Sequence, residues 1–358
     1  MTKSLFLCGS KYTLFNCINL ANSVEFQNSI CDIIVFCDKG LENVAENLSK
    51  VGIFRKVIKA DFVNNYSLIK KIKLFLVPKA FKEKETLQED NYDRLIVQSL
   101  FYASLVSRRI NYKEIYLIEE GLSTYTSRVY SSKKRSIFFN LFNAIFMRKN
   151  TVHVNGCYVY NSKLMVSNDI KTKDLPQISK ETDEILKKVF MYTRKDKSVR
   201  YITFLGSPYY GIRDLLENPK LASRQFEDCC DEIVKKILGS CGKSIIYRKH
   251  PRENISYEGT FDNLTIDSND NIWELISEDE ITNDSIIISF FSTAAFTPKI
   301  LYNTEPYVIF LYGILNEKVF NADLLVQGLK GSYKNSSKVL IPKTIDEAIN
   351  MMRKLTDV

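Results

Sequence analysis

The chain has 358 residues, of which 45% are hydrophobic and 26% are charged, and its formal net charge is +8. This length suffices for two domains, and the composition excludes a largely disordered chain. The positive charge favours an anionic partner, such as a nucleotide or a phosphorylated or lipid-linked substrate, with a lysine-rich solvated surface as the alternative. Long nucleic acid is disfavoured because the cations are scattered and no nucleic-acid motif is present.

The eight cysteines form no CxxC pair and no spacing with histidine that suits zinc. No run of 18 apolar residues could span a membrane, and the N-terminal residues predict a buried strand rather than a signal peptide. We therefore expect a reduced protein located in the cytoplasm.

The first half of the chain alternates short apolar runs with helical patterns, which is typical of βαβ units and a parallel sheet. In chain order we predict a strand at 5–8, a helix to about 23, strands at 32–37 and 56–59, helices at 67–76 and 93–108, and a strand at 115–118. The pattern breaks between about 161 and 183, where Pro176 and several charges predict the connection between domains.

The same alternation resumes in the second half. We predict strands at 201–205, 243–248, 286–289, 307–311 and 338–342, with helices at 224–238, at 292–301 and from 345 onward. The predicted fold is two doubly wound, Rossmann-like α/β domains that face each other across a cleft. The N-terminal domain is expected to span 1–175 and the C-terminal domain 176–358.

Ligands of parallel sheets bind beyond the carboxyl ends of the strands, and three polar motifs follow predicted strands there. The first is Glu119-Glu120-Gly121. Adjacent carboxylates raise each other's proton affinity, so one of them could act as a general base, and the glycine permits a sharp turn. Two solvated glutamates at the edge of a loop are the alternative.

The second motif is His250-Pro251, which lies among the cations Arg248, Lys249 and Arg252. A histidine among cations at a strand end suits a phosphate, since the imidazole can contact a leaving oxygen while a cation neutralises its charge. A solvated basic turn is the alternative.

The third motif is Ser292-Thr293, where a strand gives way to a predicted helix. Hydroxyls and backbone N–H groups at a helix N-terminus bind anions, although a plain N-cap is equally consistent with the pattern. A base in the first domain and a phosphate-binding wall in the second is the layout for glycosyl transfer from a nucleotide-activated donor.

With these motifs the chain resembles the bacterial sialyltransferases of the two-domain GT-B type, most closely glycosyltransferase family 52. Those families share a D/E-D/E-G motif, an HP motif and a Ser/Thr pair, matched here by Glu119-Glu120-Gly121, His250-Pro251 and Ser292-Thr293. Gly206-Ser207-Pro208 lies where family 52 often has Gly-Gln-Pro.

The resemblance implies inverting, metal-independent transfer of sialic acid from CMP-sialic acid to a galactose-type hydroxyl of a surface glycan, either lipooligosaccharide or capsular polysaccharide. A transferase using another nucleotide sugar, a polysialyltransferase and a non-catalytic nucleotide-binding protein are the alternatives. The sequence does not distinguish an α2,3 from an α2,6 linkage.

The resemblance also implies roles for individual residues. Glu120 corresponds to the general base with Glu119 beside it, and His250 to the group that contacts the CMP phosphate. Ser292 and Thr293 correspond to phosphate-binding hydroxyls. An aspartate of the second domain has also been assigned the base role in family 52, for which the candidates are Asp228 and Asp231.

Three further segments carry expectations. Glu278-Asp279-Glu280 is predicted to be a solvated loop rather than a metal-binding DxD motif, so no metal or cofactor is expected. Loops near Gly9-Ser10 and 123–131 are expected to recognise the acceptor. The apolar segment 136–149 follows the basic run 133–135 and could lie on the inner face of the cell membrane, pack in a homodimer or form a buried helix.

Overall fold

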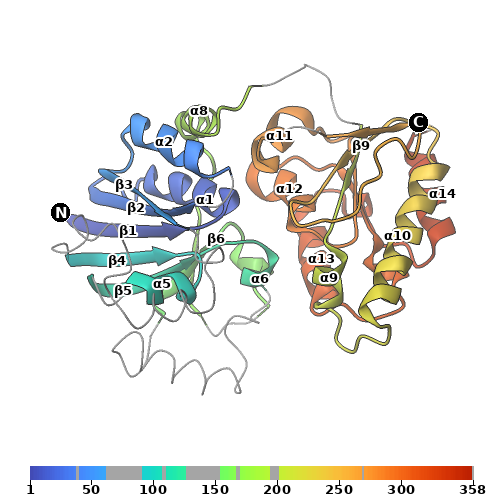
Figure 1. Ribbon diagram of the computed structural model, residues 1–358, viewed down its shortest axis with the longest axis horizontal. Coiled ribbons are helices and arrows are strands. Elements are labelled where there is room, and N and C mark those ends of the chain that lie inside the picture. The colour runs from blue at the N-terminus through green and yellow to red at the C-terminus, as the bar shows by residue number, and fades with distance from the viewer. Residues whose placement is uncertain are drawn as a thin grey trace. The chain divides into compact units, whose positions relative to one another are not determined.

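A computed structural model describes residues 1–37, 40–61, 91–106, 110–125, 154–166, 170–193, 201–267 and 270–356 (Figure 1). The chain divides into two compact units, Met1–Thr193 and Arg194–Val358. Each unit is built around its own parallel sheet. The predicted helix at 67–76, and the apolar segment 136–149 with its basic run, lie outside the described residues.

In the described part of unit 1, seven strands pair in parallel in the order β3-β2-β1-β4-β5-β6-β7. The strands are β1 (Thr2–Cys8), β2 (Ser29–Cys37), β3 (Lys56–Asp61), β4 (Asn91–Val97), β5 (Asn111–Ile118), β6 (Gly156–Val159) and β7 (Thr172–Asp174). The helices are α1 (Lys11–Ala21), α2 (Glu42–Val51), α5 (Leu100–Val106), α6 (Leu122–Tyr125) and α8 (Lys180–Val189).

The central strands of unit 1 are apolar because the sheet has helices packed against it. Leu5, Phe6 and Leu7 of β1 are fully buried although their side chains alternate between the two faces. Burial on both faces is typical of parallel sheets and explains the continuous apolar runs in the sequence.

The prediction of one helix over 93–108 was wrong. Residues Asn91–Val97 form β4, which pairs with β1 and β5, and only Leu100–Val106 is helical. Pairing with two neighbouring strands satisfies backbone groups on both edges of this segment, which outweighs the helix-like spacing of its apolar residues.

The division between the units follows Thr193 rather than residue 175 as predicted. The segment taken for a connection contains β7, which pairs with β6, and is followed by α8. Helix α8 is fastened to unit 1 because Asn22 donates to the Thr182 hydroxyl at 3.0 Å and Asn47 donates to the Val189 carbonyl at 3.3 Å. The predicted boundary was therefore too early.

In the described part of unit 2, six strands pair in parallel in the order β10-β9-β8-β11-β12-β13. The strands are β8 (Ile202–Leu205), β9 (Ile245–Arg248), β10 (Leu264–Ile266), β11 (Ile286–Ser289), β12 (Tyr307–Phe310) and β13 (Val339–Leu340). The helices are α9 (Tyr209–Arg213), α10 (Ser223–Ser240), α11 (Trp273–Glu280), α12 (Thr297–Tyr302), α13 (Ala322–Ser332) and α14 (Ile345–Thr356).

Two predictions for unit 2 need correction. No single helix spans 292–301: a 3₁₀ turn over Thr293–Ala295 precedes the short α12, because Pro298 at the start of α12 fits only a first helical turn. Residues 278–280 are not a solvated loop but the last residues of α11, and Glu280 is buried there.

The strand orders confirm the predicted doubly wound α/β class. In such a sheet the chain winds outward in both directions from a central pair of strands, β1 and β4 in unit 1 and β8 and β11 in unit 2. Beyond the carboxyl ends of that pair the connections diverge and leave a crevice, which is where doubly wound proteins bind their ligands. Among the described helices, none combines the length and apolar composition needed to cross a bilayer.

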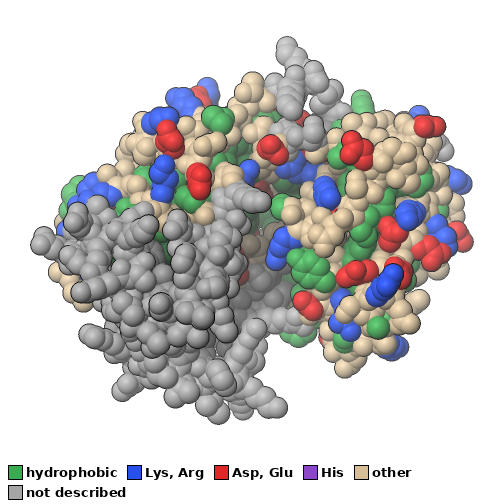
Figure 2. All heavy atoms as spheres, in the orientation of Figure 1, with side chains coloured by type: hydrophobic (Ala, Val, Ile, Leu, Met, Phe, Trp, Pro, Cys, Tyr) green, Lys and Arg blue, Asp and Glu red, His purple; other side chains and the backbone are tan. Residues whose placement is uncertain are grey.

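Charges on unit 2 are interspersed rather than segregated. In Figure 2, Lys and Arg side chains alternate with Asp and Glu side chains over the face that carries α10 and α14. On α10, Lys235 pairs with Asp231 at 2.7 Å and Lys236 with Glu232 at 2.6 Å. Exposed helical pairs of this kind contribute only about 0.3–0.5 kcal/mol each, so they describe a solvated surface and not a binding patch.

Candidate active site

The strand register of unit 2 brings three predicted motifs to one edge of the sheet. Arg248 of β9 lies beside Leu205 of β8, and Leu205 lies beside Ser289 of β11. The three strands therefore end in the same row, and the Gly206, His250 and Ser292 motifs leave the sheet next to one another. This edge includes the carboxyl ends of β8 and β11, the central pair beyond which doubly wound proteins bind their ligands.

Gly206 makes room for a buried carboxylate. Its N–H donates to the Arg248 carbonyl at 2.9 Å, which continues the pairing of β8 with β9. A Cβ atom at this position would collide with the Glu253 carboxylate and lie 2.9 Å from the Tyr247 hydroxyl. Of its two motif neighbours, Ser207 is buried and Pro208 precedes α9.

Replacing Gly206 with alanine is expected to destabilise unit 2 by about 1–3 kcal/mol, the usual cost of overpacking a tight site. The midpoint of urea unfolding measures this loss. Gly242→Ala is the matched control, because an added Cβ there meets no atom within 4 Å. Equal midpoints for the two variants would contradict the crowding described here.

His250 lies half-buried in a turn that follows β9. Its Nδ1 accepts a hydrogen bond from the backbone N–H of Arg252 at 3.0 Å, and its own N–H donates to Glu253 Oε2 at 3.0 Å. Burial, with the nearby charge of Arg252, lowers the pKa of His250 to about 4. The imidazole is therefore neutral at physiological pH.

The cations around His250 differ in their surroundings. Arg248 pairs with Asp267 at 2.7 Å and also donates to the Asn271 carbonyl, so its charge is already balanced within the protein. Lys249 and Arg252 are exposed on either side of the turn. Of the three predicted cations, Lys249 and Arg252 are therefore more accessible to a phosphate than Arg248.

Ser292 caps the short turn at the end of β11. Its hydroxyl accepts from the Ala294 N–H at 3.3 Å, and both Ser292 and Thr293 remain half-exposed. The turn is held from the other side by Trp273, which is the only tryptophan in the sequence and donates to the Ala294 carbonyl at 2.7 Å. Because this is a short 3₁₀ turn and not a helix, the motif offers a ligand two hydroxyls rather than a helix dipole.

In unit 1, the two adjacent glutamates after β5 have different environments. Glu119 is buried and accepts three hydrogen bonds, from Tyr12 at 2.6 Å, from the Tyr160 N–H at 2.9 Å and from Tyr125. Burial raises the pKa of Glu119, although these hydrogen bonds lower it in part. Glu120 is half-exposed, so it is the carboxylate that a substrate could reach.

The turn that carries Glu120 depends on Gly121. This residue has a φ of +126°, a conformation that glycine adopts without the strain of a side chain. The Thr124 N–H donates to the Gly121 carbonyl at 3.0 Å, and the Thr124 hydroxyl accepts from the Glu120 N–H at 3.0 Å. These bonds fix the backbone of Glu120 independently of its carboxylate.

The structure brings Gly9 and Ser10 to the same edge of unit 1 as the glutamates. The Gly9 N–H donates to the Gln98 side chain at 2.8 Å, and Ser10 caps α1, whose first turn supplies Tyr12 to Glu119. An added Cβ on Gly9 would collide with the Tyr102 hydroxyl. Of the second predicted acceptor loop, residues 126–131 lie outside the described part.

The two aspartates on α10 are placed differently. Asp231 accepts from the Tyr257 hydroxyl at 2.8 Å through Oδ1 and pairs with Lys235 at 2.7 Å through Oδ2. Asp228 is exposed on the same helix. Both oxygens of Asp231 are bonded inside the protein, which makes it poorly suited to accept a proton from a substrate.

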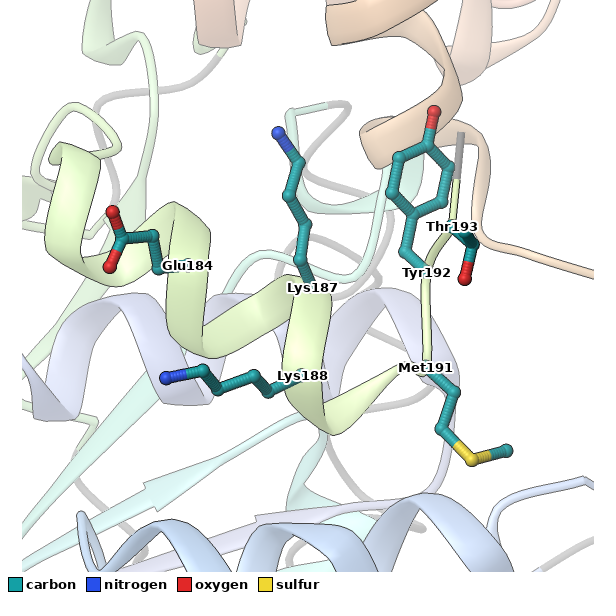
Figure 3. A pocket seen from close by; sticks show the side chains of 6 residues that line it. All are labelled: Glu184, Lys187, Lys188, Met191, Tyr192 and Thr193. Carbon is teal, nitrogen blue, oxygen red and sulfur yellow. The ribbon is translucent and has the colours of Figure 1, made fainter. Parts of the chain in front are cut away.

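A hollow of about 480 Å³ lies at the end of α8 (Figure 3). It is lined by Glu184, Lys187, Lys188, Met191, Tyr192 and Thr193, which include none of the motif residues. Over the described ranges, no three His, Cys, Asp or Glu side chains lie close enough together to hold a metal ion.

Two residues of the site were not predicted from the sequence. The signal for Glu253 is its position three residues after His250, where a turn brings it back to the histidine. Trp273 could have been noticed because it is the only tryptophan, but nothing local to it indicates that it supports the Ser292 turn.

Comparison with known proteins assigns the family. The model of glycosyltransferase family 52 matches residues 31–311. The chain belongs to glycosyltransferase family 52. This confirms the resemblance drawn from the motifs, all of which lie in the matched region. No curated protein matches this family 52 chain significantly.

Solved structures show the fold of this family 52 protein. The GT-B domain of a sialyltransferase from Photobacterium damselae matches with a TM-score of 0.51 at 12% identity, over 95% of this chain and 100% of that one. LpCGTa in complex with UDP gives 0.52 at 10% identity, over 100% and 91%. Anabaena HepE in complex with UDP and glucose gives 0.50 at 10% identity, over 100% and 90%. The predicted GT-B class is confirmed; at these identities the likeness concerns the fold alone.

Proposed function

We propose that this family 52 glycosyltransferase is an inverting sialyltransferase that uses CMP-sialic acid and needs no metal. The observation that carries the proposal is the register of β9, β8 and β11. The three strands end level with one another, so the motifs that follow them start side by side. Such an edge offers hydroxyls, exposed cations and an imidazole to a single phosphate.

In the proposed reaction an acceptor hydroxyl oxygen bonds to the anomeric carbon of sialic acid while the bond from that carbon to the phosphate oxygen of CMP breaks. Glu120 takes the proton of the hydroxyl as general base. His250 and the hydroxyls of Ser292 and Thr293 bind the departing phosphate, and Lys249 offsets its charge. A nucleoside monophosphate carries less charge than a diphosphate, so these groups could suffice.

The acceptor in this proposal is a galactose-type hydroxyl of a surface glycan, either lipooligosaccharide or capsular polysaccharide. The enzyme would work in the cytoplasm or at the inner face of the cell membrane. That Glu120 and His250 act on the same substrate remains a prediction.

Donor choice tests the proposal. The purified protein is expected to release CMP from CMP-sialic acid and to sialylate a galactose-terminated acceptor, with UDP- and GDP-sugars giving no product. Chromatography of the nucleotide and of a labelled acceptor measures both results. Turnover of a UDP-sugar with none of CMP-sialic acid would replace this proposal with the alternative donor class.

A further inference from the structure

Two hydrogen bonds between His250 and Glu253, one donated by each residue, close the turn that carries His250. The Glu253 N–H donates to the His250 carbonyl at 2.9 Å, and the His250 N–H donates to Glu253 Oε2 at 3.0 Å. Pro251, at the second position of this four-residue turn, has the fixed φ that such turns favour. The backbone and one side chain therefore define a single conformation for residues 250–253.

Glu253 is itself held on the side away from His250. It is buried, and its Oε1 accepts from the Tyr247 hydroxyl. Tyr247 lies on β9, stacks on Phe204 of β8 with ring centroids 5.3 Å apart and meets the edge of Tyr257 at 5.1 Å. The absence of a side chain on Gly206 leaves the space that this carboxylate fills. Strands β8 and β9 thus anchor the turn.

The same turn determines which ring nitrogen of His250 carries the hydrogen atom. The Arg252 backbone N–H can only donate, so the His250 Nδ1 that it contacts at 3.0 Å must accept. In a neutral imidazole one ring nitrogen accepts and the other carries the proton. The proton is therefore on Nε2, the ring nitrogen away from the backbone.

We propose that Glu253 is a positioning residue that closes the His250 turn, and that this turn fixes His250 as the neutral Nε2–H tautomer, which donates a hydrogen bond to the leaving phosphate. The phosphate in this statement rests on the proposed function; the tautomer and its dependence on Glu253 do not.

This role differs from that of a general acid. A neutral Nε2–H can stabilise the departing phosphate oxygen by donating a hydrogen bond and keeps its proton, so no imidazolium has to form before each turnover. Burial and the charge of Arg252 both oppose an imidazolium at this place, in agreement with the geometry. The carboxylate of Glu253 lies against the backbone N–H of His250 and not against its ring.

Nitrogen-15 NMR of the histidine rings tests the tautomer directly on the full-length protein at pH 7.5. The chain has two histidines, so the spectrum of a His250→Asn variant identifies the His250 signals by their loss. The wild type is expected to show a neutral ring protonated at Nε2. A ring protonated at Nδ1, or an imidazolium, would overturn the inference whatever the enzyme transfers.

Two substitutions test the dependence on Glu253. Glu253→Gln keeps an oxygen for the His250 N–H and an amide that can donate to Tyr247, so it is expected to keep the Nε2–H spectrum. Glu253→Ala loses both contacts and is expected to show a mixture of tautomers. The exposed Glu258→Ala is the control. An unchanged tautomer in a folded Glu253→Ala variant would remove Glu253 from its positioning role.

Turnover gives a separate readout. With CMP-sialic acid, Glu253→Gln is expected to keep kcat within about threefold and Glu253→Ala to lower it about tenfold or more, with KM changing less than kcat. Equal losses in both variants would mean that the charge of Glu253 is required and would overturn a positioning role. If no variant or wild type turns over CMP-sialic acid, the proposed function fails while the NMR result still decides this inference.

Discussion

Glu120→Gln is expected to lower kcat for sialyl transfer by about 10²–10⁴-fold, the range that general-base catalysis contributes. The amide cannot accept the proton of the acceptor hydroxyl. The turn should survive the change because the Glu120 backbone N–H is bonded to Thr124 and not to the carboxylate. Steady-state kinetics with CMP-sialic acid and a galactose-terminated acceptor measure the loss.

Glu114→Gln is the matched control for this substitution. Glu114 lies in the first half of β5, the strand that precedes Glu120, and is also half-exposed. Its replacement should leave kcat within about twofold. If Glu120→Gln retained wild-type kcat, the base would have to be sought elsewhere, with Asp228 on α10 as the first candidate.

Glu119→Ala is expected to act on stability, lowering the free energy of unfolding of unit 1 by about 3 kcal/mol or more. The substitution leaves the buried hydroxyl of Tyr125, the buried N–H of Tyr160 and the hydroxyl of the half-buried Tyr12 without their acceptor. Each such donor costs about 1–3 kcal/mol. Urea unfolding followed by circular dichroism measures the change.

Glu46→Ala provides the comparison, because Glu46 is exposed on α2 and makes one pair with Lys50 at 3.7 Å. It should shift the unfolding midpoint little. A Glu119→Ala protein as stable as this control, but devoid of turnover, would reverse the roles given to the two adjacent glutamates.

The fold class could be predicted because parallel strands buried on both faces leave long apolar runs, such as Ile33–Phe36 and Ile286–Ile288. The strand β4 was mistaken for part of a helix since Leu95–Val97 and the next apolar residues, on α5, combine into a helical spacing. Only pairing with β1 and β5, which are distant in sequence, decides the matter.

The motifs could be located from the sequence, but the different environments of the residues within each motif could not be predicted. In the sequence, Glu119 and Glu120 are two identical neighbouring residues. They differ in the structure because Tyr12 and Tyr160, from other parts of the chain, donate hydrogen bonds to Glu119. The sequence likewise suggests that Arg248 is available to a ligand, whereas in the structure it forms an ion pair with Asp267. Partners that come from distant segments are invisible to local patterns.

The row formed by Arg248, Leu205 and Ser289 also limits how this enzyme can be altered. Side chains on a strand alternate between faces, so inserting or deleting one residue within the four-residue β8 would turn Gly206 away from Glu253 and break the row. Length changes are expected to be tolerated only in connections beyond the strand ends. Attempts to broaden the range of accepted sugars should therefore vary those connections and leave the strand lengths untouched.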